Sequence, residues 1–262
     1  MTLRSARASV MGVVTWGLVL TLGCAPADDR DVVAVSVAAS LSPAFTEIVE
    51  SYERRHPERS VRINTAASGI LARQIEQGVP ADLFLSASPV EVDRLNKRGA
   101  LDSDSITPIA FGSMVVVVRL GSTPPETLGD LANPAIERIA IGNPETVPQG
   151  RYAREALIRA GIWERVHDRL ILGESAHQVL NYVVGGEVDA ALVYKSDTAG
   201  LLTWAPFAVP GPEVETDSPV TYVGAVPRDA ERPDLGREVL AFVMSPDGQA
   251  ILDRFGFLPP EP

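Results

Sequence analysis

The sequence predicts an α/β protein of two lobes, each with a mostly parallel sheet flanked by helices, and a ligand cleft between the lobes. Three observations lead to this fold class. β-branched runs of strand length alternate with stretches of helical periodicity along most of the chain. The alternation stops and restarts once near the middle. The length of 262 residues also suits two lobes of about 100 residues each.

The first 27 residues form a separate segment, which we predict to be a signal peptide. A short basic region with Arg4 and Arg7 precedes an apolar run over 10–22. That run is short for a transmembrane helix but typical of an exported precursor. We therefore expect an exported protein, either periplasmic or anchored on the outer face of the cytoplasmic membrane.

The end of this segment has two candidate cleavage sites. Cys24 follows Gly23 as in a lipoprotein signal, although Thr21 stands where that pattern usually has Leu. Cleavage behind the small residues Ala25-Pro26-Ala27 is the alternative. The first site predicts a lipid on Cys24, and the second predicts a mature chain without it.

The first half of the mature chain reads as three pairs of a strand and a helix. Strands are predicted from apolar and β-branched runs at 31–37, 61–65 and 82–86. Helices are predicted from apolar residues at helical spacing at 41–56, 70–77 and 90–98. Pro43 suits a first helical turn, and Gly78 and Gly99 end the second and third helices.

The second half begins with an apolar strand at 114–118, after which the alternation restarts. Further strands are predicted at 139–141, 170–172, 188–194 and 220–226. Helices are predicted at 151–160, 177–184, 235–244 and 249–255. The proline-rich stretch 205–219 reads as a surface connection.

The strands at 114–118 and 220–226 are the expected crossings between lobes. We therefore assign residues 28–112 and 226–262 to lobe 1, and residues 113–225 to lobe 2. Two lobes joined by two strands would bind a ligand by hinge closure.

Composition excludes several classes of function. A net charge of −11 argues against nucleic acid and anionic lipid as partners, because both recruit basic residues. The single cysteine leaves the mature domain without a disulfide or thiolate metal site. None of the three histidines has metal-ligand spacing, and neither a nucleophile elbow nor a phosphate-binding glycine loop is present. We expect no enzymatic activity and no cofactor.

Four helices are predicted to begin with small, hydroxyl or glycine residues, in the turns at 38–43, 66–70, 148–151 and 174–177. Such helix starts present free backbone N–H groups at a positive dipole end, so converging starts would hold an oxyanion without a counter-ion. For any one turn, a serine there is more often a simple N-cap. Two turns fall in each half, which makes the joint pattern more informative. Glu174 is expected to point away, and Arg73 and Arg151 to face solvent.

Five segments resemble, in the same order, the periplasmic molybdate-binding proteins of ABC importers. They are 38–41, 67–84, 142–150, 191–197 and 249–257. The resemblance covers nearly the whole mature chain and is most specific over 67–84. It implies a two-lobed type II binding fold that captures molybdate, or tungstate of nearly equal size and charge, for the membrane permease of an ABC importer.

The same resemblance implies a ligand site of neutral donors. Ser40 and Ser68 would give hydroxyl and backbone donors, Gln149 and Ala176 backbone N–H groups, and Tyr194 its phenol. Molybdenum would be bound only as its oxyanion through these residues. Backbone donors would need no particular side chain at Gln149 and Ala176. Without the resemblance, Tyr194 would read as a core residue with its hydroxyl tied to backbone.

Three alternatives remain beside a molybdate-binding protein. Sulfate, phosphate or another small oxyanion is the alternative ligand. A cytoplasmic regulatory sensor of the same fold is disfavoured by the signal segment and by the lack of a DNA-binding unit. An enzyme such as a hydrolase is disfavoured because no nucleophile has a plausible base. We expect a monomer.

Overall fold

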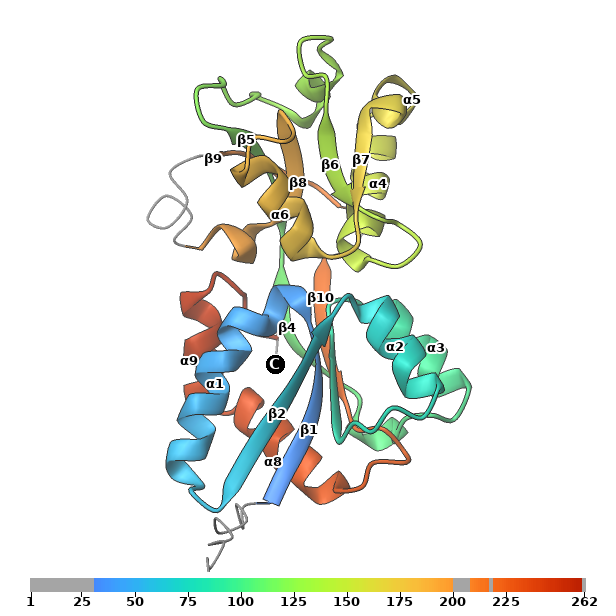
Figure 1. Cartoon of the computed structure of the whole chain (residues 1–262), viewed down its shortest axis with the longest axis vertical. Coiled ribbons are helices and arrows are strands. Elements are labelled where there is room, and N and C mark those ends of the chain that lie inside the picture. Colours follow the sequence, from blue (N-terminus) through green and yellow to red (C-terminus); the bar gives the residue numbers. More distant parts are fainter. Residues whose placement is uncertain (1–30, 200–207, 217–218, 261–262) are drawn as a thin grey trace, which may run out of the picture.

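A computed structural model of the chain describes residues 31–199, 208–216 and 219–260. The predicted signal peptide and Cys24 lie outside these ranges. The described residues form two five-stranded sheets, one in each of two lobes stacked along the long axis of the molecule (Figure 1). No helix within these ranges is long and apolar enough to cross a membrane.

Lobe 1 holds both ends of the described chain. Its sheet has the order β2-β1-β3-β10-β4, made of β1 (Asp31–Ala38), β2 (Arg59–Ala66), β3 (Leu83–Ser86), β4 (Thr107–Gly112) and β10 (Val220–Ala225). Its helices are η1 (Ala39–Leu41), α1 (Ser42–Arg55), α2 (Ser68–Glu76), α3 (Pro89–Lys97), η2 (Ser103–Ser105), α8 (Pro233–Met244) and α9 (Pro246–Arg254). Strands β1, β2 and β3 run parallel, whereas β10 runs antiparallel to its neighbours.

Helices cover both faces of this sheet (Figure 1). On one face, α1 packs Phe45 and Ile48 against the inward-facing valines of β1. On the other face, Leu71 of α2 packs with Phe84 of β3 and with residues of α3. Successive strand residues point to opposite faces, so apolar runs such as 83–85 supply both cores.

Lobe 2 repeats the arrangement. Its sheet has the order β7-β6-β8-β5-β9, made of β5 (Met114–Arg119), β6 (Ile139–Gly142), β7 (Leu170–Gly173), β8 (Ala190–Tyr194) and β9 (Ala208–Val214). Its helices are η3 (Leu128–Ala132), α4 (Pro148–Arg159), α5 (Trp163–Val166), η4 (His167–Arg169), α6 (Ala176–Val184) and η5 (Lys195–Thr198). Strand β5 shows the alternation, since Val115 and Val117 pack toward α6 while Val116 and Val118 join the core beneath α4.

The two crossings between lobes are β4 to β5 and β9 to β10. The second crossing comes earlier than the sequence division expects. β10 pairs with β3 and β4, so residues 220–225 lie in the sheet of lobe 1 and not in lobe 2. The predicted α/β architecture of two lobes is otherwise confirmed, with mixed sheets because β5, β9 and β10 run antiparallel to neighbours.

Two strands were missing from the sequence prediction, β4 and β9. β9 contains two prolines and a glycine, a composition that predicts a surface connection. Both strands lie at the edge of their sheet, where an unpaired side tolerates the missing N–H of proline. Strand propensity alone therefore understates edge strands of this kind.

Candidate functional site

The four helix starts predicted from the sequence face the junction of the two lobes. η1 follows β1 directly, α2 follows β2, α4 follows β6, and α6 follows β7. Within each lobe these strands are parallel, so their carboxyl ends meet at one edge of the sheet. Ligands of α/β proteins bind at this edge, because the following helices point their N-termini there.

A small cavity lies where these starts converge. Its volume is about 10 Å³, and it is lined by Ala38, Ala39, Ser40, Ala67, Ser68, Ala87, Val147, Pro148, Ala176 and Tyr194. Four of the five predicted site residues therefore line one cavity. Gln149 does not line it, but its neighbours Val147 and Pro148 do. This volume is on the scale of one small ion and far below the roughly 300 Å³ that an organic ligand needs.

The serines of this cavity are not helix caps. The N-cap of α2 is Ala67, and no side chain caps this helix. Instead, Ser68 Oγ accepts a hydrogen bond from the backbone N–H of Ala87 at 3.0 Å, which leaves its own proton free to donate. Ser40 likewise caps neither η1 nor α1. At α6, by contrast, the serine is an ordinary N-cap, because Ser175 Oγ accepts from the N–H of Gln178.

Backbone donors are also available at the helix starts. The first N–H groups of a helix have no partner within it. Among the described residues, no acceptor takes the N–H groups of Ser68, Gln149 or Ala176. All three residues are buried, at 1%, 0% and 5% exposure. A buried N–H group without a partner is costly, so these groups can bind an anion in the cavity.

The side chain of Gln149 corrects one expectation. It points into lobe 2, where its Oε1 accepts from the N–H of Gly142 at 2.5 Å and its Nε2 donates to the carbonyl of Leu192. The amide thus ties β6 to β8 beneath the start of α4. The expectation that position 149 needs no particular side chain is wrong, because two buried backbone groups depend on this amide.

Tyr194 ends β8 with its ring 1% exposed and its hydroxyl buried. That hydroxyl makes no hydrogen bond to any described residue, so it is not tied to backbone as a core tyrosine would be. The ring lies between Tyr152 and Tyr222, with centroid distances of 6.5 and 5.9 Å. Burial raises the pKa of Tyr194 well above its ordinary value, so the phenol stays neutral and can donate.

Two titratable groups beside the site are also neutral at neutral pH. Burial lowers the pKa of His177, which favours the uncharged ring. Burial raises the pKa of Asp197 from 3.8 to about 8, opposed by a hydrogen bond from the backbone of Tyr194. Both residues line a larger cavity of about 470 Å³ that also reaches Ser40. The site therefore presents donors without an ionised side chain of its own.

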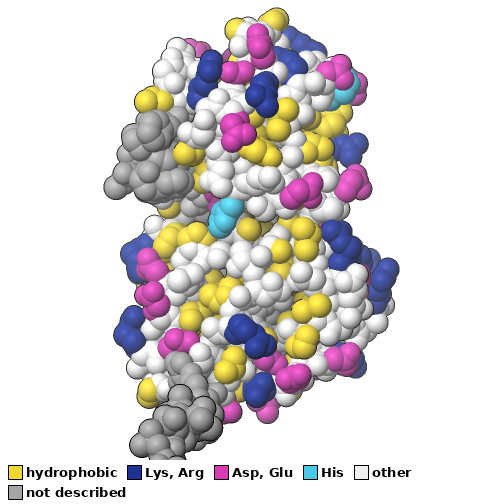
Figure 2. Space-filling view, in the orientation of Figure 1, with side chains coloured by type: hydrophobic (Ala, Val, Ile, Leu, Met, Phe, Trp, Pro, Cys, Tyr) yellow, Lys and Arg dark blue, Asp and Glu magenta, His cyan; other side chains and the backbone are white. Residues whose placement is uncertain are grey.

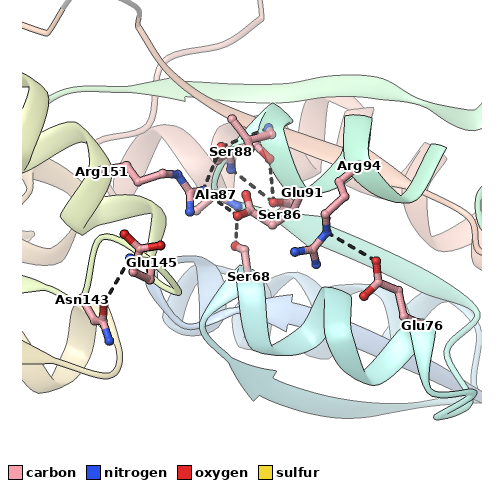
Figure 3. A network of polar contacts seen from close by, with 11 residues as sticks. Ser68, Glu76, Ser86, Ala87, Ser88, Glu91, Arg94, Asn143, Glu145 and Arg151 are labelled. Carbon is pink, nitrogen blue, oxygen red and sulfur yellow. Dashed lines mark hydrogen bonds and ion pairs between the residues drawn. The ribbon is translucent and has the colours of Figure 1, made fainter. Parts of the chain in front are cut away.

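The lobes are closed on one another. Arg151 of α4 reaches Glu91 of α3 in lobe 1, with Nη2 and Oε1 2.6 Å apart (Figure 3). The expectation that Arg151 faces solvent is wrong. A Cβ on Gly69 would lie 2.5 Å from the carbonyl oxygen of Thr146 in lobe 2, so two backbones meet there.

Two other charged residues can be compared with the expectations, since Glu174 was expected to point away and Arg73 to face solvent. Glu174 is exposed and does not line the cavity, as predicted, and Arg73 is half-buried. Figure 2 shows acidic and basic side chains mixed over both lobes on the face in view. In the part of the chain that the structure describes, no group of His, Cys, Asp and Glu could hold a metal ion.

Sequence reasoning gave no role to Glu91, Asp197, Gly69 or Thr146. Asp197 lies within the segment 191–197 that carries the resemblance, three positions after Tyr194. Its place in that segment was the available signal. Gly69 and Thr146 also lie in segments that carry the resemblance, 67–84 and 142–150. The contacts of Gly69, Thr146 and Glu91 across the cleft have no local pattern in the sequence.

Comparisons with known proteins bear on the site. A sequence model of the family described as bacterial extracellular solute-binding protein matches residues 33–258. The molybdate-binding protein ModA of Mycobacterium tuberculosis (strain ATCC 25618 / H37Rv) is 34% identical over 230 residues, covering 87% of this chain and 85% of ModA. A Bacillus subtilis (strain 168) protein, provisionally named ABC transporter substrate-binding lipoprotein YvgL, is 33% identical over 224 residues, covering 85% of both.

A solved structure shows the same fold. The sulfate-binding protein SubI from Mycobacterium tuberculosis H37Rv superposes with a TM-score of 0.76 at 20% identity, covering 89% of this chain and 88% of SubI. That identity is too low to transfer a ligand, and the likeness concerns the fold alone. The resemblance to molybdate-binding proteins inferred from the sequence is confirmed by the similarity to ModA.

Proposed function

The chain belongs to the bacterial extracellular solute-binding proteins, and we propose that it captures molybdate or tungstate and delivers it to the membrane permease of an ABC importer. One observation carries this proposal. Ser40, Ser68, Ala176 and Tyr194 line a single small cavity between the closed lobes, although they come from four separate segments. These are the positions that the resemblance to molybdate-binding proteins selects.

Each residue has a defined role in this proposal. Ser40, Ser68 and Tyr194 donate hydroxyl protons to the oxygens of the anion. The buried N–H groups of Ser68, Gln149 and Ala176 donate from the starts of α2, α4 and α6, where the helix dipoles favour negative charge. A dianion loses its water on entry, so nearly every oxygen needs a donor. Neutral donors from both lobes meet that need and make closure depend on the ligand.

Sulfate is the second candidate, because neutral hydrogen-bond donors can bind any tetrahedral dianion. Molybdate, tungstate and sulfate are all tetrahedral dianions, so neutral donors cannot separate them by charge. Selection then rests on size, because the sulfur–oxygen bond is shorter than the molybdenum–oxygen bond. Phosphate carries a proton at neutral pH and needs an acceptor, whereas the buried N–H groups here only donate.

Calorimetric titration of the purified protein with molybdate, tungstate, sulfate and phosphate tests the proposal. We expect molybdate and tungstate to bind with similar affinity, and sulfate and phosphate to bind at least about 100-fold more weakly, a difference of about 2.7 kcal/mol. Equal affinity for sulfate and molybdate would refute the specific ligand. Binding of none of the four would refute oxyanion capture.

We also propose that the protein is exported, is anchored by lipid at Cys24, and acts as a monomer. The extracellular family and the basic and apolar segment before Cys24 support export. Mass spectrometry of the mature N-terminus tests the anchor. A diacylglycerol-modified Cys24 is expected, whereas an unmodified chain that begins after Ala27 would show ordinary cleavage.

A further inference from the structure

One ion pair crosses the cleft outside the cavity. Arg151 follows the start of α4 in lobe 2, and Glu91 lies in the first turn of α3 in lobe 1. Arg151 Nη2 donates to Glu91 Oε1 at 2.6 Å and to Ser88 Oγ at 3.4 Å (Figure 3). Neither Arg151 nor Glu91 lines the oxyanion cavity. We call these two residues the closure pair.

The carboxylate of Glu91 lies in an unusually buried position. Its side chain is only 4% exposed, and its Oε2 has no hydrogen-bond partner among the described residues. Removing a carboxylate from water is costly unless a cation compensates the charge. In this structure that cation comes from the other lobe, so the closed state depends on Arg151 to compensate the charge of Glu91.

The closure pair is also connected to the ligand site through lobe 1. Ser88 accepts from Arg151 and caps α3 by accepting from the N–H of Val90 at 3.1 Å. The preceding residue, Ala87, donates its N–H to Ser68 Oγ (Figure 3). Arg151 therefore holds the short segment that orients a proposed ligand serine.

A different role for Arg151 would be as counter-ion to the bound anion. The structure disfavours it, because the guanidinium is engaged by Glu91 and lies outside the cavity lining. The charges of the pair cancel, so the site keeps its neutral donors. The two roles predict opposite effects when Glu91 loses its charge.

We propose that the closure pair sets the affinity and the release rate of the captured oxyanion without touching it. This inference rests on the proposed capture of an oxyanion by lobe closure. The pair joins residues of different lobes, so separation of the lobes breaks it and returns both charges to water. Loss of one partner leaves the other uncompensated in the closed state, which shifts the equilibrium toward the open state and speeds release.

The test is a double-substitution cycle. Arg151→Met, Glu91→Gln and the combined variant are titrated with molybdate by calorimetry, and release is followed by stopped-flow fluorescence. We expect Arg151→Met to bind about 10- to 100-fold more weakly, mainly through faster release. Glu91→Gln should bind about 10-fold more weakly, and the combined variant should recover to within about 10-fold of wild type.

Arg237→Met is the matched control, because Arg237 pairs with Asp102 at 2.7 Å within lobe 1. It should bind molybdate as wild type does. Urea unfolding of every variant identifies loss of folding, which a merely structural role would produce and the closure pair would not.

Three results would overturn the inference. They are unchanged affinity in Arg151→Met, tighter binding in Glu91→Gln, and additive losses in the combined variant. Tighter binding in Glu91→Gln would identify Arg151 as a counter-ion. If wild type binds none of the four oxyanions, the proposed function fails and the inference fails with it. Wild-type binding with unaffected variants overturns the inference alone.

Discussion

Gly69 offers a way to block closure without disturbing either lobe. It is the second residue of α2 in lobe 1, and it meets the backbone of Thr146 in lobe 2. A Cβ there would lie 2.5 Å from the Thr146 carbonyl oxygen, whereas ordinary van der Waals contact begins at 3.4 Å. The atom that the new methyl group would meet belongs to the backbone and cannot swing away. The lobes of Gly69→Ala must therefore stop roughly 1 Å farther apart than in wild type to relieve the overlap.

The size of the effect follows from this overlap. Forcing a methyl group into a packed contact costs about 1–3 kcal/mol, which corresponds to roughly 5- to 150-fold weaker binding of molybdate. The cost falls only on the closed state, because the contact exists only between lobes. In the open state, alanine is the better helix former by about 0.5–1 kcal/mol, so the free protein should be at least as stable as wild type.

Calorimetry with molybdate and urea unfolding of the free protein measure the two effects separately. Small-angle X-ray scattering should show less compaction of Gly69→Ala on adding molybdate. Gly129→Ala serves as the control, because its Cβ would meet only the Thr127 hydroxyl at an ordinary 3.5 Å within lobe 2. Wild-type affinity and compaction in Gly69→Ala, or loss of stability in its free form, would refute the reasoning.

Three further predictions concern single side chains. Ser40→Ala and Ser68→Ala should each weaken molybdate binding by about 1.5–3 kcal/mol in calorimetry, because each removes a donor to a charged ligand. Unchanged affinity would exclude the substituted serine from the site. Gln149→Ala should lower the free energy of unfolding in urea by about 2–4 kcal/mol, because two buried backbone groups lose their hydrogen bonds to this side chain. A loss below about 1 kcal/mol would contradict this role. With the pKa of Asp197 at about 8, the folded protein holds a proton between pH 4 and 8 that the unfolded chain has lost. The free energy of unfolding of wild type therefore falls as pH rises through this window. Relative to wild type, the free energy of unfolding of Asp197→Asn should rise by about 1.4 kcal/mol per pH unit from pH 5 to 8. A difference in urea unfolding that stays constant with pH would contradict the raised pKa.

Much of the fold could be predicted because local periodicity encodes it. The apolar spacing of α1 and the β-branched run of β1 each follow from neighbours a few residues apart. The edge strands β4 and β9 escaped prediction because their prolines and glycines oppose strand propensity. The position of β10 in lobe 1 was also not predicted. Packing, and not order along the chain, determines which strands join a sheet.

For the candidate site, the sequence predicted the helix starts and, through resemblance, the residues Ser40, Ser68, Ala176 and Tyr194. These positions depend on short segments with their own pattern. The sequence could not show that Ser68 is free of a capping role, since Ala67 takes the cap position only once the backbone has its final angles. It also could not show which way the Gln149 side chain points.

The contacts that close the cleft can be seen only in the folded molecule. Arg151 and Glu91 are 60 positions apart, and each alone reads as an ordinary charged residue on a helix. Their pairing and the backbone contact of Gly69 with Thr146 form only where the two lobes meet. The raised pKa of Asp197 comes from its burial in the folded protein. Burial is a property of the assembled molecule, because the cost of removing a group from water depends on everything packed around it.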